Sequence, residues 1–173
     1  MTVEQYSALP DPPGGRYELR HGVPVKVSFP TPQHWEIQQH LVEILKPLAK
    51  DRGRIGTELA FRPLPEYEVW GADVALVSQS RYDAKPPGDW MHGAPELVIE
   101  VLSPSNTPYE LDDRAAICLE NGCLEFWIVD PKRKTVKVST PDRHTITYIE
   151  GEKIPLTIPA AGGLTVSGIF SNL

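Results

Sequence analysis

The sequence predicts a mixed α/β (α+β) fold, in which a central sheet of parallel and antiparallel strands is flanked by helices. The first observation is an apolar strand over 95–102, followed by a helix pattern and a second apolar strand over 124–130. Such a unit places its two strands parallel and adjacent, with a right-handed connection. The second observation is short alternating segments at both ends of the chain, which predict antiparallel hairpins. The third is the length of 173 residues, which favours a single domain over 1–173.

The first long helix is expected to begin after Thr31, because threonine is a good N-cap and Pro32 suits the first helical position. We expect Pro47 to kink or shorten the last turn, and Gly53 to end the segment. The apolar residues recur at helical spacing and form one stripe. This stripe comprises Ile37, Leu41, Ile44, Leu45 and Leu48.

The helix between the two apolar strands begins with a capping box. Thr107 is the N-cap, Pro108 takes the first helical position, and Glu110 can reach back to the cap. The helix should run to about Asn121, where Gly122 ends it. Its inward face is expected to carry Leu111, Ala115, Cys118 and Leu119.

The remaining segments are short strands joined by turns. Residues 16–28 form a hairpin pattern whose turn is His21–Gly22, and residues 81–93 carry loop signals. Alternation of apolar and polar residues predicts the other strands. They are expected at 55–64, 72–78, 134–140, 144–150 and 154–158.

Composition narrows the class of protein. Hydrophobic residues make up 40% and charged residues 23%, which is ordinary for a globular chain. The net charge of −6 does not favour a domain that grips nucleic acid by charge alone, although a local basic patch matters more than the total. No apolar run approaches the roughly 18 residues that span a bilayer, and no signal-peptide layout is visible, so we expect a cytoplasmic protein without a membrane partner. Cys118 and Cys123 are expected to be buried thiols, not zinc ligands or a disulfide.

Two carboxylates interrupt apolar strand sequences. Glu100 lies in APELVIEVLSPS and Asp73 lies in GADVAL. A carboxylate in such a run is costly to bury unless a positive group meets it. Mg²⁺ prefers hard oxygen ligands, commonly one or two carboxylates with water and phosphate oxygens. If their strands are neighbours, Asp73 and Glu100 are candidate ligands of Mg²⁺ (or Mn²⁺).

From the residues alone, a structural ion pair is the competing interpretation of these acids. Its candidate partners are Arg62, Lys85 and Arg114.

At this point the chain resembles the Uma-two family, within the PD-(D/E)XK restriction-endonuclease-like superfamily. The resemblance is carried by GADVALVS, APELVIEVLSPS, the capped helix and NGCLEFWIVDP, with RYELRHG near the start, and it spans roughly residues 1–140. It implies a restriction-endonuclease-like fold and hydrolysis of phosphodiester bonds in nucleic acid, with DNA expected before RNA. It also implies that Asp73 and Glu100 are the first and second metal-binding acids.

Arg114 is the main departure from the family pattern. The superfamily lysine normally follows the second acid on its strand, which here is Leu102. In the resembled family it lies on the following helix, at the position of Arg114, and a tyrosine one turn later is Cys118 here. Guanidinium stays protonated and cannot serve as a general base, but it can neutralise charge or hold a phosphate. We therefore take Asp73, Glu100 and Arg114 as candidate catalytic residues.

Two functional hypotheses follow. The first is a Mg²⁺-dependent endonuclease, and the second is a catalytically degenerate nuclease fold that serves as a binding or assembly module, with Arg114 locked onto Glu100. A homodimer is possible in either case, because the resembled superfamily often pairs and the late strands could offer an edge for pairing.

Other polar residues are assigned less directly. Glu18 could also line the site, although a solvated hairpin position is favoured. Glu58 could be a third acidic ligand, although half-exposed acids on strands are common. His34 is favoured as a surface or capping histidine. We expect Ser103 and Ser105 to be turn residues. The densest basic cluster is favoured as a solvated hairpin tip, with a phosphate-contacting surface as the alternative. It consists of Lys132, Arg133, Lys134 and Lys137.

Overall fold

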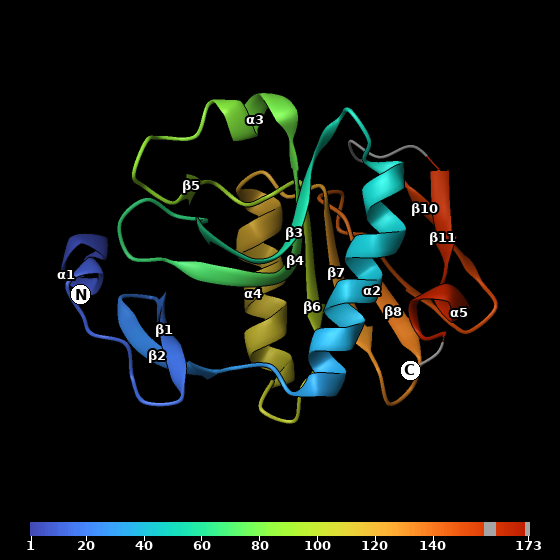
Figure 1. Ribbon diagram of the computed structural model, residues 1–173, viewed down its shortest axis with the longest axis horizontal. Helices are drawn as coiled ribbons and strands as arrows, with labels where there is room; N and C mark the ends of the chain where they lie inside the picture. The colour runs from blue at the N-terminus through green and yellow to red at the C-terminus, as the bar shows by residue number, and fades with distance from the viewer. Residues whose placement is uncertain (158–161, 172–173) are drawn as a thin grey trace.

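A mixed seven-stranded sheet organises the chain, in the order β5-β3-β4-β6-β7-β8-β9. The computed structural model describes residues 1–157 and 162–171 (Figure 1). Two antiparallel pairs, β1–β2 and β10–β11, lie beside this sheet. The strands are β1 (Gly15–Arg20), β2 (Val23–Ser28), β3 (Gly53–Arg62), β4 (Trp70–Ser78), β5 (Met91–His92), β6 (Leu97–Val101), β7 (Glu125–Asp130), β8 (Thr135–Ser139), β9 (Thr145–Tyr148), β10 (Lys153–Leu156) and β11 (Gly162–Thr165).

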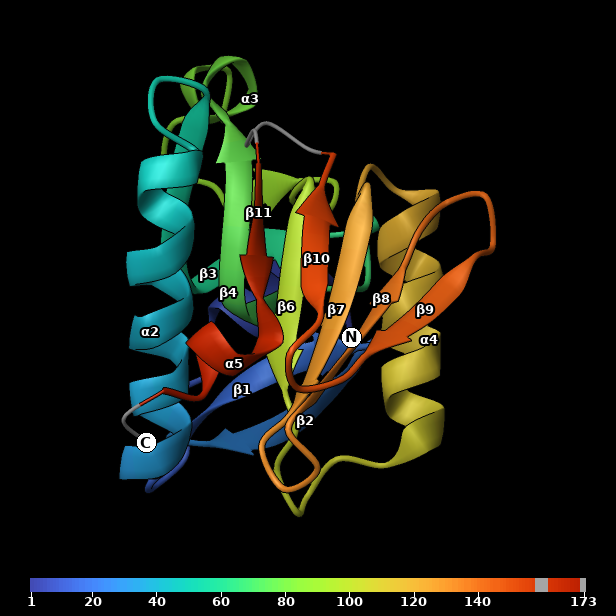
Figure 2. The same ribbon diagram turned by 90° about the vertical axis from the view of Figure 1, so that its right-hand side faces the viewer.

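Two long helices cover opposite faces of the sheet (Figure 2). The apolar side chains of α2 share one buried cluster with β10, β11 and α5, and those of α4 share a second cluster on the other face. Successive side chains of β6 point to opposite faces of the sheet and so contribute to both clusters. Leu97, Ile99 and Val101 belong to the first cluster, and Val98 belongs to the second. Glu100 therefore faces α4. The helices are α1 (Val3–Ser7), α2 (Pro32–Leu48), α3 (Gln79–Asp83), α4 (Pro108–Glu120) and α5 (Val166–Ile169).

The crossover predicted from the sequence is confirmed. Strands β6 and β7 pair in parallel, and α4 connects them along the chain. Strand β6 is shorter than the expected 95–102. The Thr107 side chain accepts from the backbone N–H of Glu110, and the Glu110 carboxylate accepts from the N–H of Thr107, so the capping box is present. Cys118 and Cys123 are buried free thiols, as expected.

The first long helix, α2, also begins as predicted, with the Thr31 hydroxyl accepting from His34 N–H. It continues through Pro47 to Leu48 and is capped by Ala49, while Gly53 begins the next strand. The stripe residues Ile37, Leu41 and Leu45 are fully buried, and they fix α2 against the sheet.

Several features differ from the expectations. The region expected to be a loop begins with the short helix α3, and the pair β10–β11 and helix α5 were not foreseen as units. The final strand expected at 154–158 is β10, and its last expected residue, Ile158, lies outside the described residues. Within the residues described, no helix is both long enough and apolar enough to cross a membrane.

Candidate active site

A cleft opens where β4 and β6 separate. Their backbone pairing ends at Val74–Ile99. Immediately beyond it, the Asp73 carboxylate accepts the N–H of Val101 through Oδ2 at 2.7 Å, in place of a backbone carbonyl. The two strands diverge from this point, and Asp73, Glu100 and Arg114 all line a cavity of about 490 Å³.

The backbone is also irregular opposite Asp73. The β3–β4 pairing is interrupted at Glu58, whose φ of 56° is in the left-handed region that a β-strand does not use. Side chains change faces here: Val74 packs on the α2 side of the sheet, whereas Ala72 packs on the α4 side. A backbone conformation that costs on the order of 1 kcal/mol or more is thus located beside the candidate ligand.

Helix α2 orients Asp73 through two side chains. Gln38, which is fully buried, donates through Nε2 to Asp73 Oδ1 at 3.0 Å and to Glu58 Oε1 at 2.7 Å. His34 Nε2 lies 3.3 Å from Asp73 Oδ2 and 3.0 Å from the carbonyl oxygen of Val101. Burial lowers the pKa of His34, but its contacts with Asp73 outweigh that effect and the pKa is raised.

These contacts correct one sequence-based assignment and add one residue. His34 was favoured as a surface or capping side chain, but it is half-buried and lines the cleft, because it lies on the inward stripe of α2 one turn before Gln38. Gln38 was missed. Its position within that same stripe, one turn before Leu41, is the signal that could have found it.

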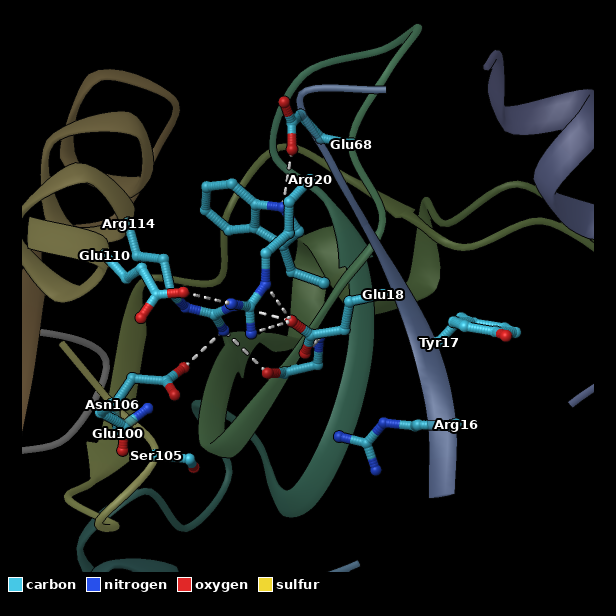
Figure 3. Close-up of polar contacts among 12 residues, drawn as sticks. Arg16, Tyr17, Glu18, Arg20, Glu68, Glu100, Ser105, Asn106, Glu110 and Arg114 are labelled. Carbon is cyan, nitrogen blue, oxygen red and sulfur yellow. Dashed lines mark hydrogen bonds and ion pairs between the residues drawn. The ribbon is translucent and has the colours of Figure 1, made fainter. Parts of the chain in front are cut away.

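On the other face, Arg114 of α4 is held between two carboxylates (Figure 3). Its Nη1 donates to Glu18 Oε2 at 3.0 Å, and its Nη2 donates to Glu100 Oε1 at 2.7 Å and to the carbonyl oxygen of Gly71 at 2.9 Å. Its guanidinium carbon lies 4.9 Å from the centre of the Trp70 ring, within the range of a cation–π contact. Only 5% of Arg114 is exposed.

Glu18 brings the β1–β2 hairpin into this site. Its Oε1 accepts the N–H of Gly71 at 2.8 Å, and its Oε2 accepts from Arg20 as well as from Arg114. Leu19 and Val69 form a backbone bridge that ties β1 to the segment before β4. Glu18 is therefore a buried member of the site, and the solvated alternative is wrong.

The charges are only partly balanced. Burial acts to raise the pKa of Glu18, but Arg114 and Arg20 outweigh it and the pKa is lowered. Burial raises the pKa of Glu100 to about 8, because Arg114 compensates it incompletely and the nearby Asp73 and Glu18 carboxylates oppose its ionisation. The pKa of Arg114 is raised by Glu100 and Glu18 despite its burial, so Arg114 stays charged.

The competing ion-pair partners are also resolved. Arg62 pairs with Asp89, and Lys85 donates to the carbonyl oxygen of Tyr82, so of the three candidates it is Arg114 that meets Glu100. Glu58 lines the cleft and pairs with Arg16.

The serines and the basic cluster lie in different surroundings. Ser103 and Ser105 are on the cleft's loop, where their hydroxyls bond to each other, in agreement with turn residues. In the basic cluster, Arg133 pairs with Asp130 and Lys137 with Asp112, and its four residues are absent from the cleft lining.

The donor set fits a magnesium-type ion with few protein ligands. Among residues 1–157 and 162–171, no three His, Cys, Asp or Glu side chains form a ready cage for a metal. Asp73 and Glu100 nevertheless offer hard oxygens in one cleft, and in this described part Arg114 is the donor to Glu100 and binds Oε1, which leaves Oε2 toward the cleft. Two carboxylates completed by water and phosphate oxygens are an ordinary Mg²⁺ arrangement. Burial keeps the pKa of Glu100 raised although Arg114 lowers it in part, and a bound cation would lower it further.

A mixed sheet between two helices, with acids at the point where strands separate, defines a restriction-endonuclease-like protein. The family model for Uma2, described as putative restriction endonuclease, matches residues 3–167, and the chain belongs to this family. The fold is also that of a crystal structure of a putative nuclease belonging to DUF820 from Anabaena variabilis ATCC 29413, with a TM-score of 0.84. That protein is 23% identical, over 99% of this chain and 98% of its own. Among functionally curated proteins, none matches the sequence.

Replacing Arg114 with Ala should lower the free energy of unfolding by about 3–5 kcal/mol, because Glu18 and Glu100 would be left buried without their cation. Urea denaturation measures this. The matched control is Arg133→Ala, whose side chain is 78% exposed in its ion pair and should cost less than about 1 kcal/mol. An equal, small loss in both variants would contradict the buried pair.

Glu100 should make stability depend on pH. Its folded-state pKa of about 8 lies above the ordinary value of 4.5, so the folded chain binds the proton more tightly. This contribution is fully present below pH 4.5 and is lost as the pH rises to about 8. Denaturation in metal-free buffer between pH 5 and 8 should show the unfolding free energy falling less in Glu100→Gln than in the wild type. Exposed Glu43→Gln is the control, and identical slopes in all three proteins would refute the assignment.

Proposed function

We propose that this protein is a metal-dependent endonuclease that hydrolyses phosphodiester bonds of nucleic acid, with DNA as the first substrate to test. Asp73 and Glu100 are its ligands for Mg²⁺ (or Mn²⁺). The observation that supports this best is that the two carboxylates come from neighbouring strands and line one cleft. Membership of the Uma2 family supports a nuclease acting on nucleic acid.

Groups of the protein hold the two candidate metal ligands in position. When bound, Mg²⁺ would supply charge stabilisation at the phosphoryl oxygens and make a water molecule more nucleophilic. Gln38 and the N–H of Val101 hold the Asp73 carboxylate in place. Arg114 fixes Glu100 through Oε1.

Arg114 acts in this proposal by neutralising charge and positioning Glu100. Three of its five N–H groups already donate to protein oxygens, one from Nη1 and two from Nη2, while its buried Nε has no hydrogen-bond partner among the described residues. It cannot take a proton from water, because a guanidinium between two carboxylates stays charged.

The second candidate function is a binding or assembly module without catalysis. The Arg114–Glu100 ion pair favours it, because a closed pair satisfies the charge of Glu100 in part without any metal. The open cleft and the incompletely compensated Glu100 favour the first function.

Cleavage separates these two functions. With Mg²⁺ or Mn²⁺ at millimolar concentration, the wild type should cut DNA or RNA substrates, single- or double-stranded. Asp73→Asn and Glu100→Gln should lower the rate at least about a hundredfold, because each removes a metal ligand. The metal should also raise the melting temperature of the wild type but not of Asp73→Ala. Exposed Glu43→Gln is the control and should behave as the wild type. Cleavage that survives Glu100→Gln would refute the site, and absence of both cleavage and thermal shift would favour the binding module.

Arg114→Lys tests whether the family's usual cation improves the site. Lysine can lose its proton when its surroundings favour it, so we expect metal-dependent cleavage to be faster than in the wild type. Arg114→Gln, which keeps hydrogen bonding without charge, is the matched control. A lysine variant that folds normally and cuts no faster would show that Arg114 is not what limits the rate.

We also propose that two copies of the chain pair through the edge strand β9. This strand pairs only with β8 in the described sheet, it carries the exposed Ile146, and the exposed Ile149 follows its last residue. Sedimentation should show a dimer for the wild type and a monomer for Ile146→Lys, with Ile146→Val as the control. A monomeric wild type at micromolar concentration would exclude this dimer.

The cytoplasmic location expected from the sequence stays a prediction.

A further inference from the structure

The β1–β2 hairpin presents two unlike rows of side chains to the cleft. In its antiparallel register Arg16 lies opposite Val27, Glu18 opposite Val25 and Arg20 opposite Val23, and directly opposed residues project from the same face. Figure 3 shows Arg16, Glu18 and Arg20 on the side of β1 that faces Arg114, while Tyr17 points away. One row is therefore charged and the other is apolar.

The apolar row continues past the end of β2. Val25, Val27, Phe29 and Pro30 all line the cleft, and Phe29 is 64% exposed. A single exposed phenylalanine is ordinary, but this one lies in the wall of the same cleft that contains the candidate metal ligands. Its position leaves an aromatic face open to whatever enters.

Cations accompany the apolar row. Arg16 and Arg20 come from β1 and line the cleft, whereas Lys26 lies opposite Tyr17 in the register and donates to the carbonyl oxygen of Pro13. Arg16 keeps about a third of its side chain exposed (32%) while it pairs with Glu58. Phosphates are attracted by such cations, and the faces of bases are attracted by apolar and aromatic side chains.

Single-stranded and duplex nucleic acid differ in which surfaces they can place against this apolar row. In a duplex the base faces are stacked on one another, and only base edges and the backbone are accessible. An open Phe29 and a row of valines suit the faces of unpaired bases, which stack on apolar and aromatic side chains.

We propose that the cleft binds single-stranded nucleic acid, with bases against Val25, Val27 and Phe29 and phosphates beside Arg16 and Arg20. This inference rests on the proposed function and deepens it, since it names the substrate form. The strand runs along the hairpin, and the phosphate to be cut lies at the Asp73 and Glu100 end of the cleft.

The test is fluorescence anisotropy with the full chain and a labelled oligonucleotide, in buffer with a chelator so that nothing is cut. The single strand should bind at least about tenfold more tightly than the same sequence in a blunt duplex. Phe29→Ala should weaken single-strand binding at least about fivefold, which is the lower end of what one stacked base contributes. Phe29→Tyr should bind as the wild type, because it keeps the aromatic face, and Phe29→Leu should not. Tyr67→Ala removes an exposed aromatic residue outside the cleft and should have no effect.

The outcomes separate this inference from the proposed function. Equal binding of duplex and single strand, or an unchanged affinity in Phe29→Ala, would overturn the inference. If metal-dependent cleavage of duplex DNA is still seen, the proposed function stands without it. If no nucleic acid is bound or cut by the folded protein, both fail. Circular dichroism of each variant checks that the fold is intact.

Discussion

The buried Arg114 joins four parts of the molecule at one point. It extends from α4 to Glu100 on β6, to Glu18 on β1 and to the backbone of Gly71 on β4. Burying a guanidinium and two carboxylates is costly, and this cost is offset only if the geometry satisfies all of them. The hairpin, the sheet and the crossover helix are therefore held in one arrangement, and that arrangement places the candidate site.

Asp73 sets the second constraint, from the opposite face. By accepting the N–H of Val101, its carboxylate ends the pairing of β4 with β6 and keeps the cleft open, while Gln38 and His34 of α2 hold it there. Glu100 belongs to the α4 face and Asp73 contacts α2, yet both line the same cavity. Burial that Arg114 compensates only in part raises the pKa of Glu100 to about 8, and perturbed pKa values of this kind cluster at functional sites.

Much of the fold could be predicted from local signals. The capping box at Thr107, the proline after Thr31 and the apolar strand around Glu100 each act within a few residues, and all are present. The roles of Glu18 and Gln38 could not be predicted as readily, because their partners lie far away in the sequence and polar residues on strands and helices are usually solvated. The same holds for Glu58: its left-handed backbone arises from the sheet irregularity opposite Asp73, for which Glu58 itself gives no signal.

The most direct test of the account is anomalous diffraction from crystals soaked in Mn²⁺. We expect a strong peak in the cleft, bonded to oxygens of both Asp73 and Glu100 at about 2.0–2.3 Å, with Arg114 still bonded to Glu18 and to Oε1 of Glu100. A cleft without a peak would contradict the central claim that these two carboxylates form a metal site.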